Sequence, residues 1–236
     1  MSTPEPNEDR PQPHVVRRLL QAFVSADSYG FVLLLIIASY VLSVTVASDW
    51  GASAVVFIQI GTVWFALRTA QARRPVRRAA FVLMVVAGLT AIASLSEPEG
   101  TRRFLFALGS VLYFVAPFSI IRHLIGRRGV DQETMLGAIS AYLLFGMFFA
   151  FFYMEISVVN DGAFFAGQAT TNMQQVLFFS FTTLTTTGYG NLVPAANPGQ
   201  TLAVSEMILG QLFLITAMGK IVTEWRPKRW SVDPPG

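Results

Sequence analysis

The chain has 236 residues, of which 13% are charged, and a mean hydropathy of +0.52. This is far too apolar for a soluble domain of this size, so the composition indicates an all-α protein embedded in membrane lipids. The net charge of +3 does not indicate a nucleic-acid partner, because the basic residues lie in short segments between apolar runs. The absence of cysteine excludes disulfides and thiolate metal sites, and no constellation of side chains indicates an enzyme.

Residues 1–28 are predicted to form a cytoplasmic N-terminal segment. Its first part is polar and rich in proline and should be disordered. Residues 14–25 are amphipathic, and they either lie at the lipid headgroups or simply connect to the first span. Because the start lacks the basic residues, apolar run and cleavage site of a signal peptide, we expect the first span to remain in the protein.

Six uncharged runs predict six spanning helices. They cover residues 29–47, 52–67, 79–95, 104–121, 136–157 and 201–222. Several are near the minimum length for a hydrocarbon core of ~30 Å. The first four form a four-helix transmembrane domain over residues 29–131, and the last two lie in a second domain over residues 132–225. Residues 226–236 should be a short cytoplasmic tail, which leaves no room for a cytoplasmic ligand-binding domain.

The distribution of positive charge predicts the orientation of these spans. In the six-span arrangement, all of the 17 lysines and arginines except Arg102 and Arg103 lie on one side of the membrane. Short cytoplasmic loops are enriched in these residues. We therefore expect both termini to be cytoplasmic and the protein to lie in a cell membrane.

The segment between the last two spans contains the most informative motif. Residues 186–190 read Thr-Thr-Gly-Tyr-Gly, and an apolar, hydroxyl-rich run at 173–185 can form a short re-entrant helix before them. This order resembles the pore domain of bacterial potassium channels, whose filter pattern is Thr-x-Gly-Tyr-Gly, over about 90 residues. The resemblance implies passive, selective permeation of K⁺ through a homotetramer, with one filter strand supplied by each chain.

The residues of this segment fit that chemistry. A dehydrating potassium ion must exchange water for protein oxygens, and stacked backbone carbonyls from residues 186–190 can supply them. Gly188 and Gly190 reach the left-handed backbone conformation, which alternating carbonyls require, without a Cβ penalty. Thr186 can add a hydroxyl oxygen at the inner end and Thr187 a carbonyl, whereas Tyr189 should point away from the ion.

Four residues around the filter are expected to support it. The resemblance gives Phe178 or Phe179 the role of clamping the filter tyrosine, although aromatic residues at such depths also serve plain packing. Asn191 stands where the family most often has aspartate. The position that pairs with it in the pore helix is Thr182, and an Asn191–Thr182 hydrogen bond should hold less strongly than a charged pair.

Glu206 is an ionisable residue well inside the last span. A carboxylate there is costly unless it faces protein or water. We expect it to pack behind the pore helix, with Ser180, Thr182 and Thr183 as candidate partners. It then either fastens the span to the pore helix as a satisfied, protonated or hydrogen-bonded group, or acts as a pH-sensitive link to the filter.

Gly210 falls where the resemblance places a gating hinge, and Gly219 is a second candidate lower in the span. The alternative is that a small residue merely lets two helices approach closely.

The first four spans match the voltage sensors of six-span channels in number only. A sensor needs several arginines spaced three apart in the fourth span, and residues 104–121 contain none. The sequence therefore predicts a potassium-selective channel without a voltage sensor. The alternatives are a less selective cation channel of the same fold, a subunit of a gradient-driven potassium transporter, and a non-conducting membrane scaffold.

Overall fold

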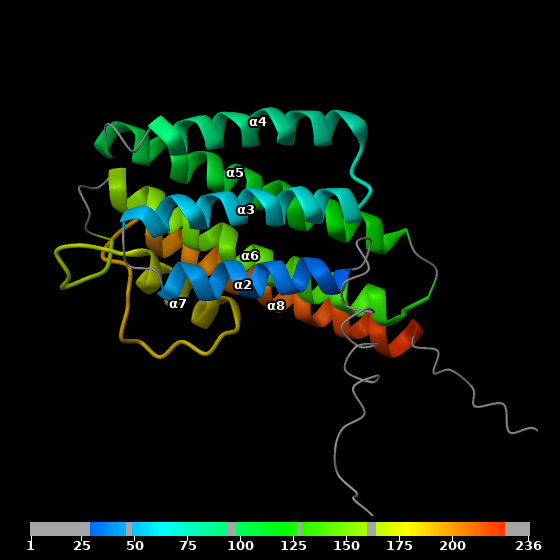
Figure 1. Ribbon diagram of the computed structural model, residues 1–236. Coiled ribbons are helices and arrows are strands. Elements are labelled where there is room, and N and C mark those ends of the chain that lie inside the picture. The colour runs from blue at the N-terminus through cyan, green and yellow to red at the C-terminus, as the bar shows by residue number, and fades with distance from the viewer. Residues whose placement is uncertain (1–28, 46–48, 94–97, 127–128, 160–163, 225–236) are drawn as a thin grey trace, which may run out of the picture.

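The structure is a computed structural model that describes residues 29–45, 49–93, 98–126, 129–159 and 164–224. The predicted N-terminal segment, with its amphipathic stretch, and the predicted tail after residue 225 lie outside these residues. Seven helices are present in the described part (Figure 1): α2 (Tyr29–Thr45), α3 (Asp49–Thr69), α4 (Arg74–Ala93), α5 (Pro98–Ile125), α6 (Gln132–Val159), α7 (Met173–Leu184) and α8 (Gly199–Glu224).

Each predicted span coincides with one of these helices, and α7 coincides with the predicted re-entrant helix. By length and composition, three of the described helices can cross a membrane: α5 from Leu108, α6 and α8. The helix α2 is apolar but shorter. In α4 the apolar part begins only after Arg78. The structure therefore supports a helical membrane protein, and spans one to three remain predictions.

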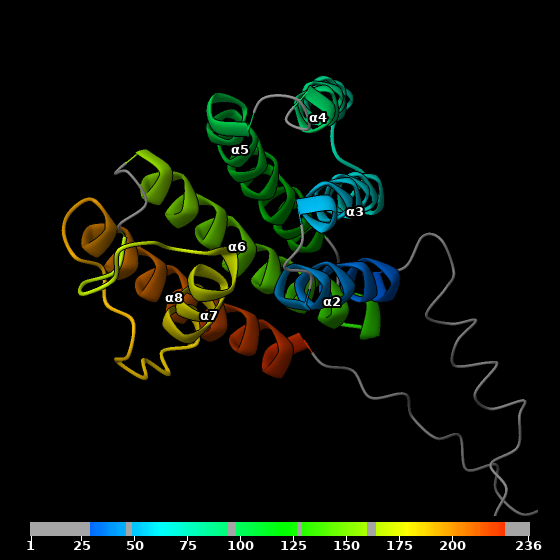
Figure 2. The ribbon, with the colours of Figure 1, turned by 60° about the vertical axis from the view of Figure 1, so that its left-hand side comes forward.

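The helix α6 lies at the centre of the molecule. It packs against α2, α5, α7 and α8. Figure 2 shows α3, α4 and α5 on one flank of α6, with α7 and α8 on the opposite flank. The four-helix domain and the second domain predicted from the sequence thus meet along α6.

Hydrogen bonds from side chains join the two domains at their edges. The backbone N–H of Tyr29, the first residue of α2, donates to Glu133 Oε2 at 3.0 Å. The amide of Gln174 in α7 donates to the Val44 carbonyl near the end of α2. Lys220 Nζ of α8 donates to the Leu124 carbonyl at 3.4 Å. Each of these bonds satisfies a backbone group at a helix end, where the helix itself provides no partner.

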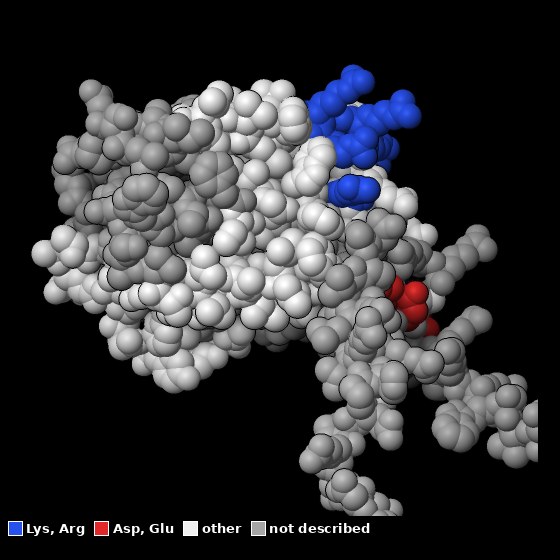
Figure 3. Space-filling model, viewed as in Figure 1, with Lys and Arg blue, Asp and Glu red and all other residues white. Residues whose placement is uncertain are grey.

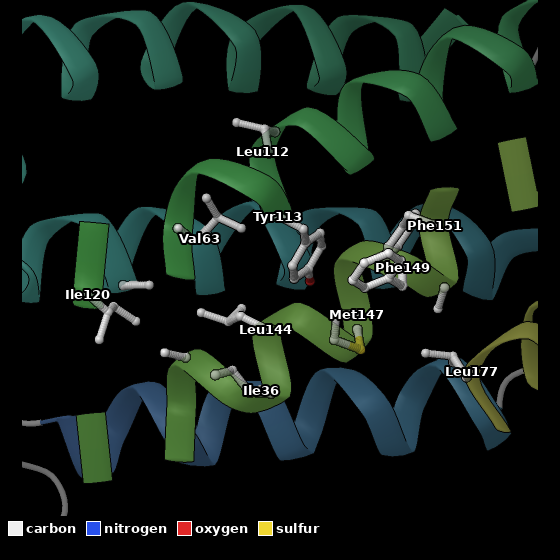
Figure 4. Packing of buried hydrophobic residues seen from close by; sticks show 14 of the residues in the cluster. Ile36, Val63, Leu112, Tyr113, Ile120, Leu144, Met147, Phe149, Phe151 and Leu177 are labelled. Atoms are coloured by element: carbon white, nitrogen blue, oxygen red, sulfur yellow. The ribbon is translucent and has the colours of Figure 1, made fainter. Parts of the chain in front are cut away.

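The core between α2, α3, α5 and α6 is mainly apolar and includes an aromatic stack (Figure 4). Ile36, Val63 and Leu144 are buried there. The Tyr113 ring stacks on Phe151 with centroids 5.1 Å apart. Fully buried alanines, such as Ala116 in α5, let the helices approach closely, which is the main source of packing energy where lipid removes the hydrophobic driving force.

Positive charge gathers at one end of the described molecule. Arg68 lies in the last turn of α3, Arg73 directly precedes α4, and Arg74, Arg77 and Arg78 lie near the start of α4; all five are exposed. Figure 3 shows this cluster at the end where α8 also finishes, far from the loop that follows α7 in Figure 1. The segment of residues 186–190 and the arginine cluster are therefore at opposite ends of the helices.

Candidate functional site

The short helix α7 begins with a complete capping box. Asn172 Oδ1 accepts from the backbone N–H of Gln175 at 2.9 Å, and Gln175 Oε1 accepts from the backbone N–H of Asn172 at 3.0 Å. Two of the N–H groups that a helix start leaves without partners are satisfied in this way. The cap explains why α7 starts at Met173, as the sequence predicted.

The loops on either side of α7 are tied together. The backbone N–H of Ala166 donates to the Val193 carbonyl at 2.9 Å, and the N–H of Ala195 donates to the Phe164 carbonyl at 2.9 Å. The residues that follow the predicted filter are thereby fixed against the residues that precede α7. The segment 185–190 is consequently held at both of its ends.

The backbone of that segment alternates in handedness. Thr186, Gly188 and Gly190 have φ angles of +57°, +53° and +78°, whereas Thr187 and Tyr189 are not in this region. The two glycines were expected there, but Thr186 was not, because a β-branched residue at positive φ is strained. Every second residue thus takes the left-handed conformation, which is the pattern that a strand with carbonyls turned to one side requires.

The alternating segment is anchored to the last turns of α7. The Thr182 carbonyl accepts from the backbone N–H of Thr187 at 2.8 Å and of Gly188 at 3.1 Å. The Thr185 and Thr187 hydroxyl oxygens lie 2.9 Å apart. Residues 185–190 are exposed on the single chain, so their hydroxyls and carbonyls are available to another molecule or ion. Among the described residues no group of three or more acidic, histidine or cysteine side chains could hold a metal.

Of the two candidate clamp residues, only Phe178 lies beside Tyr189. The rings of Phe178 and Tyr189 stack with centroids 5.7 Å apart and an interplanar angle of 16°. Phe179 faces the other way and packs edge-on against Tyr153 and Phe165 in the interior. Phe179 is therefore a core residue of the packing between α6 and α7.

The expected bond between Asn191 and Thr182 is absent from the described residues. The Thr182 hydroxyl donates instead to the Phe179 carbonyl at 3.0 Å, one helical turn back. This local acceptor is always within reach of a helical threonine, whereas Asn191 lies on an exposed loop. In the single chain the Thr182 hydroxyl is thus engaged within α7.

Glu206 of α8 is fully buried against α7 and α6. Its Oε1 lies 2.5 Å from the Ser180 hydroxyl oxygen, and its Oε2 accepts from the Tyr153 hydroxyl at 2.6 Å. The Ser180 oxygen also lies 2.7 Å from the Gly146 carbonyl oxygen of α6. Ser180 was one of the three partners suggested by the sequence, but Tyr153 was missed. The only signal for it was a hydroxyl within a run of phenylalanines, which an apolar interior tolerates only with a partner.

Gly210 lies one turn further along α8, where that helix touches the end of α7. A Cβ atom on Gly210 would lie 2.4 Å from the Leu184 carbonyl oxygen and 3.0 Å from Leu184 Cδ1. The Tyr142 hydroxyl of α6 donates to the same carbonyl at 2.9 Å, and the Tyr142 ring stacks on Phe213 of α8. Close approach is thus a sufficient reason for glycine at position 210. Gly219 has open space around its Cβ position.

Most of the α8 surface is left uncovered. Only Gly199, Ala203, Glu206 and Gly210 are buried on this helix. The exposed large apolar side chains are Val204, Met207, Ile208, Leu209, Leu212, Leu214, Ile215, Met218 and Val222. A face of this kind suits lipid or other protein chains and does not suit water.

Comparison with known proteins bears on this same part of the chain. No curated protein and no solved structure matches it. Residues 137–225 match the family model described as "Ion channel". The matched range includes nearly all of α6, the whole of α7 and α8, and the alternating segment between them. The match supports an ion-channel pore domain over residues 137–225, with passive ion transport as its activity.

Proposed function

We propose that this chain forms a homotetrameric, potassium-selective channel that carries K⁺ passively across a cell membrane. The observation that carries the proposal is the alternating backbone of Thr186, Gly188 and Gly190 directly after a capped pore helix. Left-handed residues at every second position let successive carbonyls turn toward one line. Oxygens from four such strands could then replace the hydration shell of a potassium ion.

The end of α7 adds an electrostatic contribution. The helix ends at Leu184, just before the alternating segment, so the negative end of its dipole lies at the base of the proposed filter. The Thr185 and Thr187 hydroxyls lie at the same place. Neutral oxygens and helix dipoles favour a cation without binding it so tightly that it cannot leave.

The surface of the single chain supports assembly into a ring. Tyr189 is 70% exposed although it is a large aromatic residue, and its partner Phe178 is also exposed. The uncovered face of α8 is on the same domain. One strand cannot enclose an ion, so several copies around an axis are needed, and four is the number that the resemblance implies.

The charge distribution supports the proposed orientation. The arginine cluster between α3 and α4 lies at the end opposite the proposed filter (Figures 1 and 3). With that end cytoplasmic, the filter is extracellular and both termini are cytoplasmic, as positive-inside topology requires. The arrangement of six spans and the location in a cell membrane are part of the same proposal.

A less selective cation channel is the alternative that one observation favours. Asn191 makes no bond to Thr182 among the described residues, so the outer end of the filter lacks the brace that a paired carboxylate gives in the family pattern. A looser outer end would reduce discrimination against sodium.

Flux from liposomes tests the proposal. Purified protein in vesicles loaded with potassium chloride and diluted into potassium-free buffer should take up external rubidium and little sodium, because potassium efflux leaves the vesicle interior negative. The matched control is Gly188→Ala, which places a Cβ on a residue with a φ of +53° and costs about 1–2 kcal/mol per strand. We expect this variant to insert and assemble but to lose rubidium uptake. Equal rubidium and sodium uptake would favour the less selective channel, and no uptake by the wild type would contradict conduction.

A further inference from the structure

The oxygen atoms around Glu206 make three close contacts, whereas the two neighbouring hydroxyl groups can donate only two hydrogen bonds. Three oxygen pairs lie within hydrogen-bond distance: Gly146 O with Ser180 Oγ at 2.7 Å, Ser180 Oγ with Glu206 Oε1 at 2.5 Å, and Glu206 Oε2 with Tyr153 Oη at 2.6 Å. Each close contact between two oxygens needs a proton between them, since lone pairs otherwise repel.

Counting donors leaves one proton missing. A serine hydroxyl and a tyrosine hydroxyl carry one proton each, and a backbone carbonyl carries none. Tyr153 can serve only its contact with Oε2. Ser180 can serve either Gly146 or Glu206, but not both. The third proton can come only from the carboxyl group itself.

Among the described residues, no positively charged side chain compensates a carboxylate charge at this position. From α6, Tyr153 and Tyr142 face this region, and the Tyr142 hydroxyl is already bonded to the Leu184 carbonyl. From α7, Ser180 faces it. No lysine, arginine or histidine among the described residues pairs with Glu206, whose side chain is fully buried. An uncompensated charge at this depth is one of the costliest groups a membrane helix can carry.

We infer that Glu206 is a neutral carboxylic acid whose own proton completes a hydrogen-bond chain from α8 through Ser180 to α6. Glu206 donates to Ser180, Ser180 donates to Gly146, and Tyr153 donates to Glu206. Every contact then has its proton and no charge is buried. The protonation itself is independent of what the protein conducts.

These hydrogen bonds make Glu206 a positioning residue for the proposed filter, a role that rests on the proposed function. Ser180 lies one helical turn before Leu184, so the bond fixes the part of α7 that leads into residues 185–190. Ionisation would remove the donor to Ser180 and bury a charge. The stability due to this proton is full at acidic pH, where the unfolded chain is also protonated, and it is lost progressively as the pH rises.

Infrared spectroscopy of the purified protein in lipid tests the protonation directly. At neutral pH ordinary surface carboxyl groups are ionised. We expect the wild type to show the carbonyl stretch of a neutral carboxylic acid, Glu206→Gln to lack it, and Glu224→Gln, whose carboxylate lies 3.7 Å from Lys220 Nζ at the end of α8, to retain it. Ser180→Ala should shift the band, because its hydrogen-bond acceptor is gone. A wild-type spectrum at neutral pH without a band sensitive to either Glu206→Gln or Ser180→Ala would overturn the inference.

A pH profile tests the positioning role. Glutamine has the shape of the neutral acid and retains an N–H donor, so Glu206→Gln should conduct at neutral pH and remain unchanged under alkaline conditions. Wild-type rubidium uptake should fall in alkaline buffer as the infrared band disappears. Identical alkaline profiles for wild type and Glu206→Gln would refute the role. If neither protein conducts at any pH while the band behaves as expected, the proposed function fails and the protonation stands.

Discussion

At the scale of single residues, the site depends on a few contacts so close that no larger side chain fits. Gly210 is the clearest case, because the Leu184 carbonyl occupies the space that any side chain would need. The same carbonyl accepts the Tyr142 hydroxyl. One oxygen at the end of α7 therefore sets the distance between α7 and α8 and also the position of α6 against them.

Replacing Gly210 by alanine should separate α8 from α7. An overpacked site typically costs 1–3 kcal/mol, which is about 2–12 °C in melting temperature for a chain of this size. The matched control is Gly219→Ala in the same helix, where a Cβ meets no atom of the described residues within 4 Å. Thermal unfolding in detergent, followed by helical circular dichroism, compares the two. Equal melting temperatures for both variants would show that the contact with Leu184 is unimportant.

The sequence predicted the polar contacts of this site only in part. Ser180 could be proposed because it lies on α7 at the depth of Glu206. Tyr153 and Tyr142 could not, because their roles depend on how α6 rotates against α7, and sequence spacing does not determine that rotation. The positive φ of Thr186 was also missed, since local propensity disfavours it and hydrogen bonds to the Thr182 and Thr183 carbonyls accompany it.

At the scale of elements, α7 is held at three levels. Its start is capped by Asn172 and Gln175, its middle is bonded through Ser180, and its end is bonded by Tyr142. The bounds of α7 and of the long helices were predictable, because capping residues and uncharged runs define them locally. The pairing of Asn191 with Thr182 rested on a family pattern, and in the single chain the Thr182 hydroxyl has a nearer acceptor in α7.

Removing the Tyr142 hydroxyl should loosen the end of α7. In Tyr142→Phe the ring can still stack on Phe213, but the Leu184 carbonyl loses its donor, a loss of about 0.5–1.5 kcal/mol. We expect a melting temperature lower by a few degrees and reduced rubidium uptake. Tyr40→Phe is the matched control, because the Tyr40 ring packs edge-on against Phe181 and no hydrogen bond of its hydroxyl is found in the described residues. A Tyr142→Phe protein indistinguishable from Tyr40→Phe would show that the bond from Tyr142 to the Leu184 carbonyl does not hold the end of α7.

At the scale of the whole molecule, α6 is the helix of the channel-like unit that packs most extensively against the four-helix unit. The described part of α5 crosses from Leu108 to Ile121 without a charged residue and continues as a helix through Pro117. Moving one charge through the full membrane potential changes the energy by about 2.3 kcal/mol per 100 mV, so steep voltage gating needs several charges within the field. This part of α5 contains no charged residue that could move in the membrane field.

Open probability should therefore depend only weakly on voltage. Recordings in planar bilayers with symmetric potassium should give a shallow curve that changes with the permeant ion. Neutralising Arg122, near the end of α5, should leave that curve unchanged. A steep sigmoid that is lost on neutralising Arg102, Arg103 or Arg122 would restore a sensor role to the first four helices.

The central claim is that residues 186–190 select potassium, and a bi-ionic reversal potential tests it most directly. The measurement places potassium on one side of a bilayer containing the purified protein and an equal concentration of sodium on the other. If the alternating strand selects by replacing the hydration shell of potassium, the current should reverse far from zero, in the direction set by potassium moving alone. A current through the wild-type protein that reverses at zero would contradict the account.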